Sequence, residues 1–367
     1  MNKPLRNILS PVLFPLSLLY GFIIYIRNRL FDYNLFKSNQ FNIPLISVGN
    51  ITVGGTGKTP HIEYLTNLLK SEFKVATLSR GYKRKSKGFI LSTINSTDTE
   101  IGDEPKQIKQ KFPDIDVAVD ESRTRGINKL IQQKNPDVIL LDDAFQHRKV
   151  NPGLSILLID FSRPINKDFM LPFGNLREQE FEKRRAKIII VTKSPNDLKP
   201  IERRIIFNEI KPYPFQHVFF TCFDYGKITP VFGNSENKIE DNISKNYEVL
   251  LVTGIANPKP LKKYILENIS KNIHNLEYSD HYSFKDSDFK TITRKFKEIG
   301  SDNKIIITTE KDAMRLQKFS NIADNLKESF FYIPIQVKFL NNRTDNFNQQ
   351  VIEYVRKNKE HSFLYPG

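Results

Sequence analysis

The stretch Gly49–Pro60 reads GNITVGGTGKTP, and it decides the fold. It ends in Gly-Lys-Thr, which is how a phosphate-binding loop closes. The apolar run IPLISVGNI (43–51) precedes the loop, and the helical pattern HIEYLTNLLKSE (61–72) follows from about Pro60. A strand before the loop and a helix after it form the context in which such a loop binds a nucleotide. One position departs from the usual pattern, because Thr52 stands where the first glycine is normally found.

Each residue type in the loop suits a phosphate ligand. Glycines allow backbone N–H groups to turn inward around phosphate oxygens, a lysine adds positive charge, and a threonine hydroxyl is a ligand for Mg²⁺. We therefore expect ATP and Mg²⁺ as cofactors. The predicted ATP-binding residues are Thr52, Val53, Gly54, Gly55, Thr56, Gly57, Lys58 and Thr59.

Short β-branched runs alternate with helical stretches along the rest of the chain. They are KVATLSRGY (74–82), DVAVD (116–120), DVILLDDA (137–144), LSILLIDF (154–161) and AKIIIVTK (186–193). Later runs are HVFFTCFDY (217–225), YEVLLVTGI (247–255), NKIIITTEK (303–311) and SFFYIPIQVKF (329–339). This alternation predicts an α/β fold of the P-loop NTPase type, a mainly parallel sheet with helices on both faces. We expect a membrane-associating segment (1–40), a nucleotide-binding domain (41–214) and a second, smaller α/β domain (215–367), with the hinge near Lys211–Pro214.

The N-terminus carries an uncharged apolar segment. Residues Ile8 to Ile26 contain no charged side chain over 19 positions, and basic residues flank them on both sides. That length just reaches the roughly 20 residues needed to span a bilayer. We favour a helix that dips into one leaflet, with a buried hairpin of the core as the alternative. A cleaved signal peptide fits poorly, and the single Cys222 is compatible with a reducing compartment.

The chain is strongly basic, with 56 Lys and Arg against 41 Asp and Glu and a formal net charge of +15. Such an excess favours an anionic partner, whether nucleic acid, an acidic membrane surface or a phosphorylated substrate. A lysine-rich proteome produces the same excess. Charge alone therefore does not identify the partner.

A second motif, VILLDDAFQHRK (138–149), places two carboxylates at the end of an apolar strand. In P-loop enzymes a carboxylate in this position faces Mg²⁺. Asp142 and Asp143 are therefore the predicted metal ligands together with Thr59, and the sequence leaves open which aspartate touches the ion.

Further polar side chains have ordinary interpretations when each is considered locally. Asp103 and Glu104 in IGDEP (101–105) are typical of a solvated acidic loop, and His281 in DHYSF (280–284) of a structural or exposed histidine. Arginine forms two parallel hydrogen bonds to phosphate, so Arg80, Arg123 and Arg177 are candidate ligands of an anionic substrate.

The order of these motifs resembles one family closely, the tetraacyldisaccharide 4'-kinases of lipid A biosynthesis. The resemblance rests on SVGNITVGGTGKTP, LSRGY, GDEP, LLDDAFQHRKV, LPFGNLRE, DHYSF and TEKDA, which run from about residue 45 to 313. The loop with Thr52 is itself characteristic of that family. One departure is Ala144, where the family pattern has glycine, and we expect the extra methyl group to be tolerated.

The resemblance implies transfer of the γ-phosphate of ATP to the 4'-hydroxyl of a tetraacyldisaccharide 1-phosphate. It implies Asp103 as the base on that hydroxyl, with His281 and Lys58 also catalytic. The residues implied to bind the substrate are Arg80, Arg123, Gln146, His147, Arg177 and Glu178. It further implies an anionic glycolipid substrate, attachment to the cytoplasmic face of the bacterial inner membrane, and neither nucleic acid nor an obligate protein partner.

Two other classes of protein compete with this interpretation. One is a membrane-associated P-loop ATPase or GTPase that acts on a protein partner, for which TKSPND (192–197) only approximates a guanine-specificity motif. The other is a nucleic-acid-binding ATPase, which the charge suggests but for which no recognition module is present.

Overall fold

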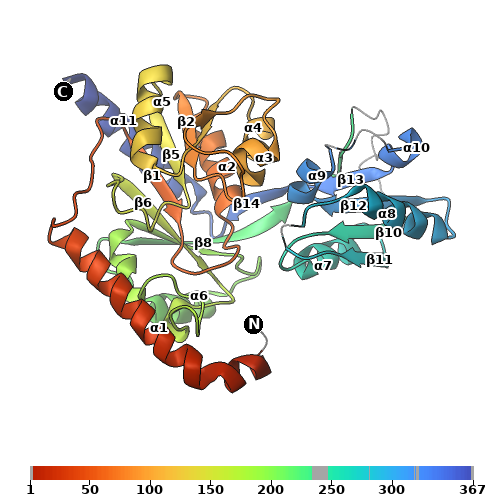
Figure 1. The fold of residues 1–367 in the computed structure, drawn as a ribbon, viewed down its shortest axis with the longest axis horizontal. Coiled ribbons are helices and arrows are strands. Elements are labelled where there is room, and N and C mark those ends of the chain that lie inside the picture. Colours follow the sequence, from red (N-terminus) through yellow and green to blue (C-terminus); the bar gives the residue numbers. More distant parts are fainter. Residues whose placement is uncertain (1–2, 234–246, 281, 318, 320–321, 365–367) are drawn as a thin grey trace. The chain divides into compact units, whose positions relative to one another are not determined.

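The computed structural model describes residues 3–233, 247–280, 282–317, 319 and 322–364. They form two compact units, drawn in Figure 1. Unit 1 contains Met1–Phe223 and Val337–Gly367, and unit 2 contains Asp224–Gln336.

Unit 1 is built on a nine-stranded sheet with the order β14-β8-β7-β6-β1-β5-β2-β4-β3 among the described residues. Its first strands are β1 (Leu45–Gly49), β2 (Val75–Ser79), β3 (Ile90–Leu91), β4 (Asp116–Val119) and β5 (Val138–Asp142). The others are β6 (Leu154–Asp160), β7 (Ile188–Thr192), β8 (His217–Tyr225) and β14 (Ile335–Phe339). The strands from β8 to β4 pair in parallel, and β3 pairs with β4 antiparallel. This confirms the expected mainly parallel α/β sheet.

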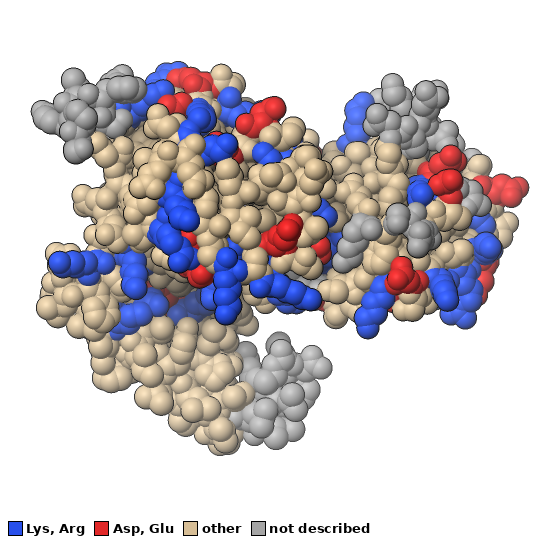
Figure 2. Space-filling view, turned by 45° about the horizontal axis from the view of Figure 1, so that its top comes forward, with Lys and Arg blue, Asp and Glu red and all other residues tan. Residues whose placement is uncertain are grey.

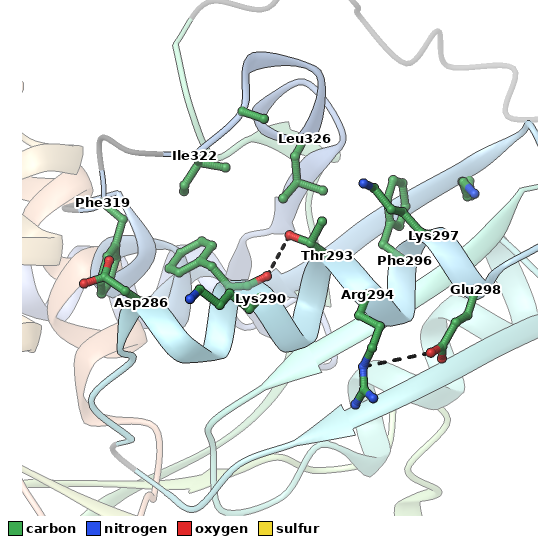
Figure 3. Close-up of a pocket in the computed structure, with 13 residues that line it drawn as sticks. Asp286, Lys290, Thr293, Arg294, Phe296, Lys297, Glu298, Phe319, Ile322 and Leu326 are labelled. Atoms are coloured by element: carbon green, nitrogen blue, oxygen red, sulfur yellow. Dashed lines mark hydrogen bonds and ion pairs between the residues drawn. The ribbon is translucent and has the colours of Figure 1, made fainter.

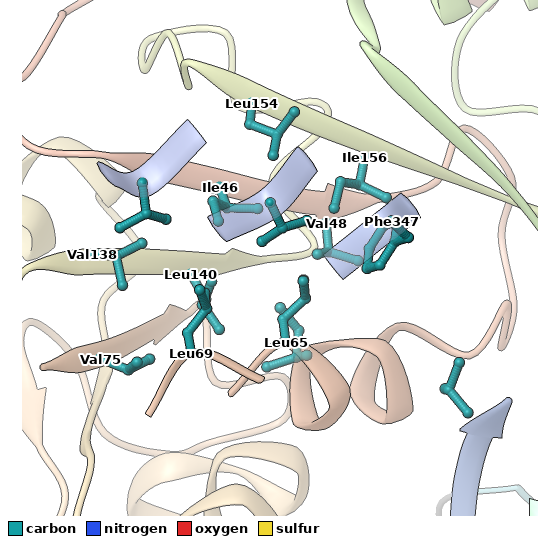
Figure 4. Close-up of a cluster of buried hydrophobic side chains, with 14 of the residues drawn as sticks. Ile46, Val48, Leu65, Leu69, Val75, Val138, Leu140, Leu154, Ile156 and Phe347 are labelled. Carbon is teal, nitrogen blue, oxygen red and sulfur yellow. The ribbon is translucent and has the colours of Figure 1, made fainter. Parts of the chain in front are cut away.

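Helices cover both faces of this sheet. The long helices are α1 (Lys3–Asp32), α2 (Lys58–Leu69), α4 (Asp103–Lys111), α5 (Arg123–Lys134), α6 (Pro200–Ile210) and α11 (Thr344–Leu364). The short ones are α3 (Asp98–Ile101) and the 3-10 turns η1 (Ile165–Lys167) and η2 (Glu180–Arg185). Every residue of β1 is buried, which is typical of a parallel strand with helices on both sides. Figure 4 shows Ile46 and Val48 on one face of β1, packed with Leu65 of α2 and Phe347 of α11. Leu45 points to the opposite face and belongs to another cluster.

The boundary between the units differs from the expected division at residues 214 and 215. The chain leaves unit 1 after Phe223 and returns at Val337, so β8 and the C-terminal helix belong to the first unit. Pro334 separates β13 (Phe330–Ile333) from β14 within a run that looks like one strand in the sequence. The return is stabilised by α11, because Val351 and Val355 are fully buried in the core of unit 1.

Unit 2 is a smaller α/β unit, as expected. Its sheet has the order β11-β10-β12-β13-β9 among the described residues, parallel except for the pair of β13 with β9. Its remaining elements are β9 (Thr229–Pro230), β10 (Glu248–Thr253), α7 (Lys259–Asn268), β11 (Asn272–Glu277), α8 (Asp286–Glu298), β12 (Lys304–Thr309), α9 (Glu310–Leu316) and α10 (Asp324–Lys327). The sequence pattern missed β11 because this edge strand, NIHNLE, is mostly exposed and lacks an apolar run.

The N-terminal segment is one continuous helix, α1, with Pro11 and Pro15 inside it. Residues Pro11–Asp32 are long and apolar enough to cross a membrane by length and composition, and 17% of the most apolar window is buried. One side of α1 is bound to the segment that precedes β7. Ser17 Oγ donates to the carbonyl of Met170 (2.7 Å), and the Gly21 carbonyl accepts from Gln179 Nε2 (2.5 Å). The alternative of a buried hairpin is not observed, because Lys3–Asp32 form one helix whose opposite side is exposed.

Candidate active site

The phosphate loop connects β1 to α2, and the surrounding structure holds its backbone in place. The Gly57 φ angle is +90°, in the left-handed region that favours glycine, and α2 begins at the next residue, slightly before Pro60. Thr56 is buried, and its hydroxyl accepts a hydrogen bond from Asn50 Nδ2 (2.8 Å). Its carbonyl accepts from the Thr192 hydroxyl (2.8 Å) at the end of β7. The loop is thus tied to β1 and to β7.

Thr52 has a structural reason for not being glycine. Its backbone forms an antiparallel bridge with Leu176, and Val53 N donates to the Asn175 carbonyl (2.8 Å). Arg177 N donates to the Ile51 carbonyl (2.7 Å). The first part of the loop is therefore extended and paired with the segment that carries Arg177, so no positive φ angle is needed at Thr52.

The two carboxylates after β5 have different surroundings. Asp143 forms ion pairs with Lys58 Nζ (3.7 Å) and with Arg177 Nη1 (3.3 Å). Asp142 is buried, and its Oδ1 atom has no hydrogen-bond partner among the described residues. Asp143 therefore has its charge balanced by the protein, whereas Asp142 has an oxygen available for a ligand.

The electrostatics of Asp142 fit a divalent cation. Burial raises the pKa of its carboxyl group, the negative charge of Glu104 raises it further, and Lys58 acts in the opposite direction. A cation next to Asp142 would balance this concentration of carboxylates. The described residues contain no group of three or more His, Cys, Asp or Glu side chains that could hold a metal. In phosphoryl-transfer sites, substrate phosphates and waters supply most of the ligands of Mg²⁺.

Asp103 and Glu104 lie in the first turn of α4 rather than in the expected acidic loop. Gly102 precedes them with a φ angle of +92°, and a Cβ atom there would lie 3.0 Å from the Tyr82 carbonyl oxygen. The close approach of the chain at Gly102 starts the helix at Asp103. Negatively charged side chains in the first turn of a helix interact favourably with the helix dipole.

Arg123 is buried and holds the backbone at the end of β5. Its Nη1 donates to the Asp120 carbonyl (2.8 Å) and its Nη2 to the Asp142 carbonyl (3.2 Å). Burial lowers the pKa of the Arg123 guanidinium to about 10. That Arg123 binds the substrate stays a prediction, and in the structure both of its Nη nitrogens donate to backbone carbonyls.

His147 lies among cations. Burial and the charge of Arg123 lower its pKa to about 4, with further lowering by Arg80 and Arg27. Its imidazole is therefore neutral at pH 7. The positive charges that shift its pKa are those expected around an anionic ligand, and Arg80 itself is exposed.

Glu178 connects the site to α1. Its side chain is fully buried and accepts from Arg27 (2.9 Å) and Asn28 (3.1 Å) of α1. Its other oxygen accepts from Gln146 Nε2 (3.2 Å) and from Arg185. Both Glu178 and Gln146 were predicted as substrate ligands, and in the structure each is bound to protein groups. Gln146 Nε2 also donates to the Asn50 carbonyl (2.7 Å).

A cluster of charged residues in contact with the phosphate loop was not predicted from the sequence. Lys193 has a φ angle of +56°, donates to the Gly55 carbonyl and forms an ion pair with Asp160 (2.7 Å). Arg163 also pairs with Asp160 (3.2 Å). In the sequence, Lys193 lies in TKSPND (192–197), the stretch that approximates a guanine-specificity motif.

In unit 2 the motif TEKDA has a structural role at Asp312. This buried carboxylate accepts from the Thr309 hydroxyl (2.7 Å) and from Gly254 N (2.8 Å), and it pairs with Arg315 (3.0 Å). His281 lies outside the described residues. A groove of about 1080 Å³ runs along α8 (Figure 3), and it contains none of the predicted site residues.

The chain matches a family model described as Tetraacyldisaccharide-1-P 4'-kinase over residues 9–356. Similar proteins named tetraacyldisaccharide 4'-kinase occur in Bacteroides fragilis, Bacteroides thetaiotaomicron and Flavobacterium johnsoniae. The first is 48% identical over 96% of this chain and 95% of its own length. The second is 45% identical over 95% and 94%, and the third 45% over 96% and 99%.

The fold matches a solved structure of the same enzyme type. The crystal structure of LpxK from Aquifex aeolicus, described as an "apo" form in complex with ATP, superposes with a TM-score of 0.73 at 30% identity. The match covers 96% of this chain and 99% of that one.

Proposed function

The chain belongs to the tetraacyldisaccharide 4'-kinase family, and from that premise we propose how its residues divide the work of phosphoryl transfer. The reaction transfers the γ-phosphate of ATP to the 4'-hydroxyl of a tetraacyldisaccharide 1-phosphate and gives the 4'-phosphorylated lipid A precursor. One observation carries the assignment of roles. A phosphate loop faces two carboxylates, of which one is ion-paired and the other has an unpartnered buried oxygen.

The nucleotide side of the site consists of the loop 52–59. Its backbone N–H groups hold the phosphates, and Lys58 neutralises the charge on the β- and γ-phosphates. The pair of Lys58 with Asp143 positions the ammonium group before ATP arrives. Arg177, which also pairs with Asp143, lies in the segment that is hydrogen-bonded to the loop and can place a second positive charge near the transferred group.

Mg²⁺ fits beside Asp142, with the Thr59 hydroxyl as a further ligand. When bound, the ion balances the charge on the β- and γ-phosphate oxygens. We propose Asp142 as the direct ligand and Asp143 as the residue that orients Lys58 and Arg177. Electron paramagnetic resonance with Mn²⁺ and ATP tests this. Asp142→Asn should weaken Mn²⁺ binding strongly and Asp143→Asn only mildly, and the reverse order would contradict the assignment.

Asp103 is the proposed base on the 4'-hydroxyl. Asp103 lies in the first turn of α4, and its carboxylate can orient the hydroxyl and accept its proton. His281 is proposed to assist, a role that stays a prediction. Loss of a general base typically lowers kcat roughly 10²- to 10⁴-fold. Asp103→Asn should therefore remove turnover and leave ATP binding by calorimetry nearly intact. An equal loss of both would place Asp103 on the nucleotide instead.

We propose that α1 attaches the enzyme to the cytoplasmic face of the inner membrane, where ATP and the lipid meet. The exposed side of α1 is apolar, including Val12, Leu18 and Phe22, each about 60% exposed. Figure 2 shows the region of α1 as an uncharged surface bordered by Lys and Arg side chains. This arrangement suits a helix in the interface with basic residues at the headgroups.

The decisive experiment for the reaction uses γ-labelled ATP, Mg²⁺ and the disaccharide 1-phosphate lipid in detergent. Label should appear in the lipid, and omission of the lipid should leave ATP largely intact. Label released as free phosphate at the same rate with and without lipid would support an ATPase that acts on another partner.

A further inference from the structure

We propose that α6 and the turn after it form a second membrane contact, which binds an anionic bilayer surface beside α1. The proposal rests on the proposed function in one respect. A lipid substrate is the reason for choosing a bilayer as the partner of this surface. The surface is defined here as Ile201, Ile205, Phe207, Tyr213 and Phe215, and we call it the α6 patch.

The apolar residues of α6 divide between two sides of the helix. Ile206 and Ile210 point inward and pack in a core cluster of unit 1. Ile201 and Ile205, which are also four residues apart, point outward and are 60% and 52% exposed. Stabilisation of the fold explains the inner pair. It does not explain two isoleucines on the outer face, where a surface helix normally carries polar side chains.

The turn that follows α6 carries two further exposed aromatic side chains. Phe215 is 56% exposed, and its ring stacks on Tyr213 at 5.8 Å with an interplanar angle of 15°. Phe207 is 46% exposed. Exposed apolar side chains that lie close together often mark an interaction site, and a tyrosine among them is suited to the headgroup level of a membrane.

Charge around the α6 patch favours an anionic surface. Lys199, Arg204 and Lys211 are exposed at its edges. The acidic groups on the same helix are engaged locally, because Glu202 accepts from the Lys199 backbone N–H and Glu209 pairs with Lys167. Basic residues beside a shallow apolar face are the pattern by which peripheral helices bind anionic lipid.

One short segment contacts both α6 and α1. On one side of this segment, Lys167 of η1 pairs with Glu209 of α6 at 2.5 Å. On the other side, Phe169 packs edge to face against Phe14 of α1 at 6.3 Å and is itself 49% exposed. All these residues belong to unit 1, so α1 and α6 are fixed on the same unit. Two contacts would fix the orientation of unit 1 on the bilayer, which one helix alone would leave free to rotate.

The chain has no tryptophan, so a single introduced tryptophan is an unambiguous reporter. We would place it at Ile205 in the full chain, with Ile94→Trp as the matched control. Ile94 is also 52% exposed in unit 1 but lies outside the α6 patch. With phosphatidylcholine vesicles containing about one third phosphatidylglycerol, Ile205→Trp should shift its emission to the blue and be quenched by brominated acyl chains. Ile94→Trp should do neither.

A second measurement uses turnover. The double variant Ile201→Ser/Ile205→Ser should lose about tenfold in vesicle affinity, because two side chains no longer enter the acyl region. Its turnover should fall on vesicle-embedded lipid and remain normal on lipid dispersed in detergent, with Ile94→Ser normal on both. Vesicle binding needs no catalysis. Absence of kinase activity in the wild type would therefore contradict the proposed function and leave the second membrane contact to be judged by vesicle binding.

Two results would overturn the second contact. One is unquenched emission from Ile205→Trp while the protein sediments with vesicles, which would show that α1 binds alone. The other is self-association that the double variant abolishes while its vesicle binding stays unchanged, which would make the α6 patch a protein interface.

Discussion

Replacement of Glu178 by glutamine should weaken the docking of α1 next to the active site. The replacement changes the volume of the side chain little. Glu178 is fully buried, and each of its two oxygens accepts two hydrogen bonds. Glutamine replaces one of these oxygens by an NH₂ group. Whichever way the glutamine amide is turned, its NH₂ group then faces two hydrogen-bond donors. These are either Arg27 and Asn28 or Gln146 and Arg185.

The expected loss of folding free energy follows from these contacts. Removal of one partner of a buried, hydrogen-bonded ion pair costs roughly 3–5 kcal/mol. Arg27 retains some access to water, with its side chain 34% exposed, so the cost should lie near the lower end, at about 3 kcal/mol. The same change at Glu72, in a surface pair with Arg356, is the matched control and should have little effect.

Urea unfolding monitored by circular dichroism measures the loss as a shift of the transition midpoint. We expect a clear shift for Glu178→Gln, together with a raised KM for the lipid and a nearly unchanged KM for ATP. Equal midpoints for Glu178→Gln and Glu72→Gln would refute the reasoning, because they would show that the buried network contributes nothing to the docking of α1.

Three further predictions concern the phosphate loop and its surroundings. Gly49→Ala places a Cβ atom 2.7 Å from the Phe145 Cβ and should destabilise by about 1–3 kcal/mol in thermal unfolding, whereas a Tm equal to that of the wild type would contradict this close approach. NMR should show His147 titrating near pH 4, below its ordinary pKa of 6.5. The folded state therefore binds this proton less readily than the unfolded state. Lowering the pH from 6.5 towards 4 should decrease the free energy of unfolding. Its pKa should rise when the anionic lipid neutralises the neighbouring arginines, and an unchanged pKa would place the lipid phosphate elsewhere. Lys193→Met should raise the KM for ATP by loosening the loop at the Gly55 carbonyl, and an effect confined to the lipid KM would exclude this role.

Much of unit 1 could be predicted because its signals are local. The phosphate loop, the aspartate pair and the alternation of buried strands with helices each occupy short stretches whose chemistry does not depend on distant residues. The division into units could not be predicted, because it depends on which sheet a strand joins. Only pairing in space shows that β8 and β14 lie at the edge of the first sheet.

The sequence by itself determined the fold class, the nucleotide site and the resemblance to a kinase family, because these follow from residue types at fixed spacing. Tertiary structure decided what each polar group does. It distinguishes Asp142, with an unpartnered buried oxygen, from Asp143, which is held by two cations. It also shows that Glu178, a predicted substrate ligand, accepts hydrogen bonds from Arg27 of α1 and from Gln146. The physical reason is that charge balance and burial depend on neighbours far apart in the chain, and only the folded structure brings them together.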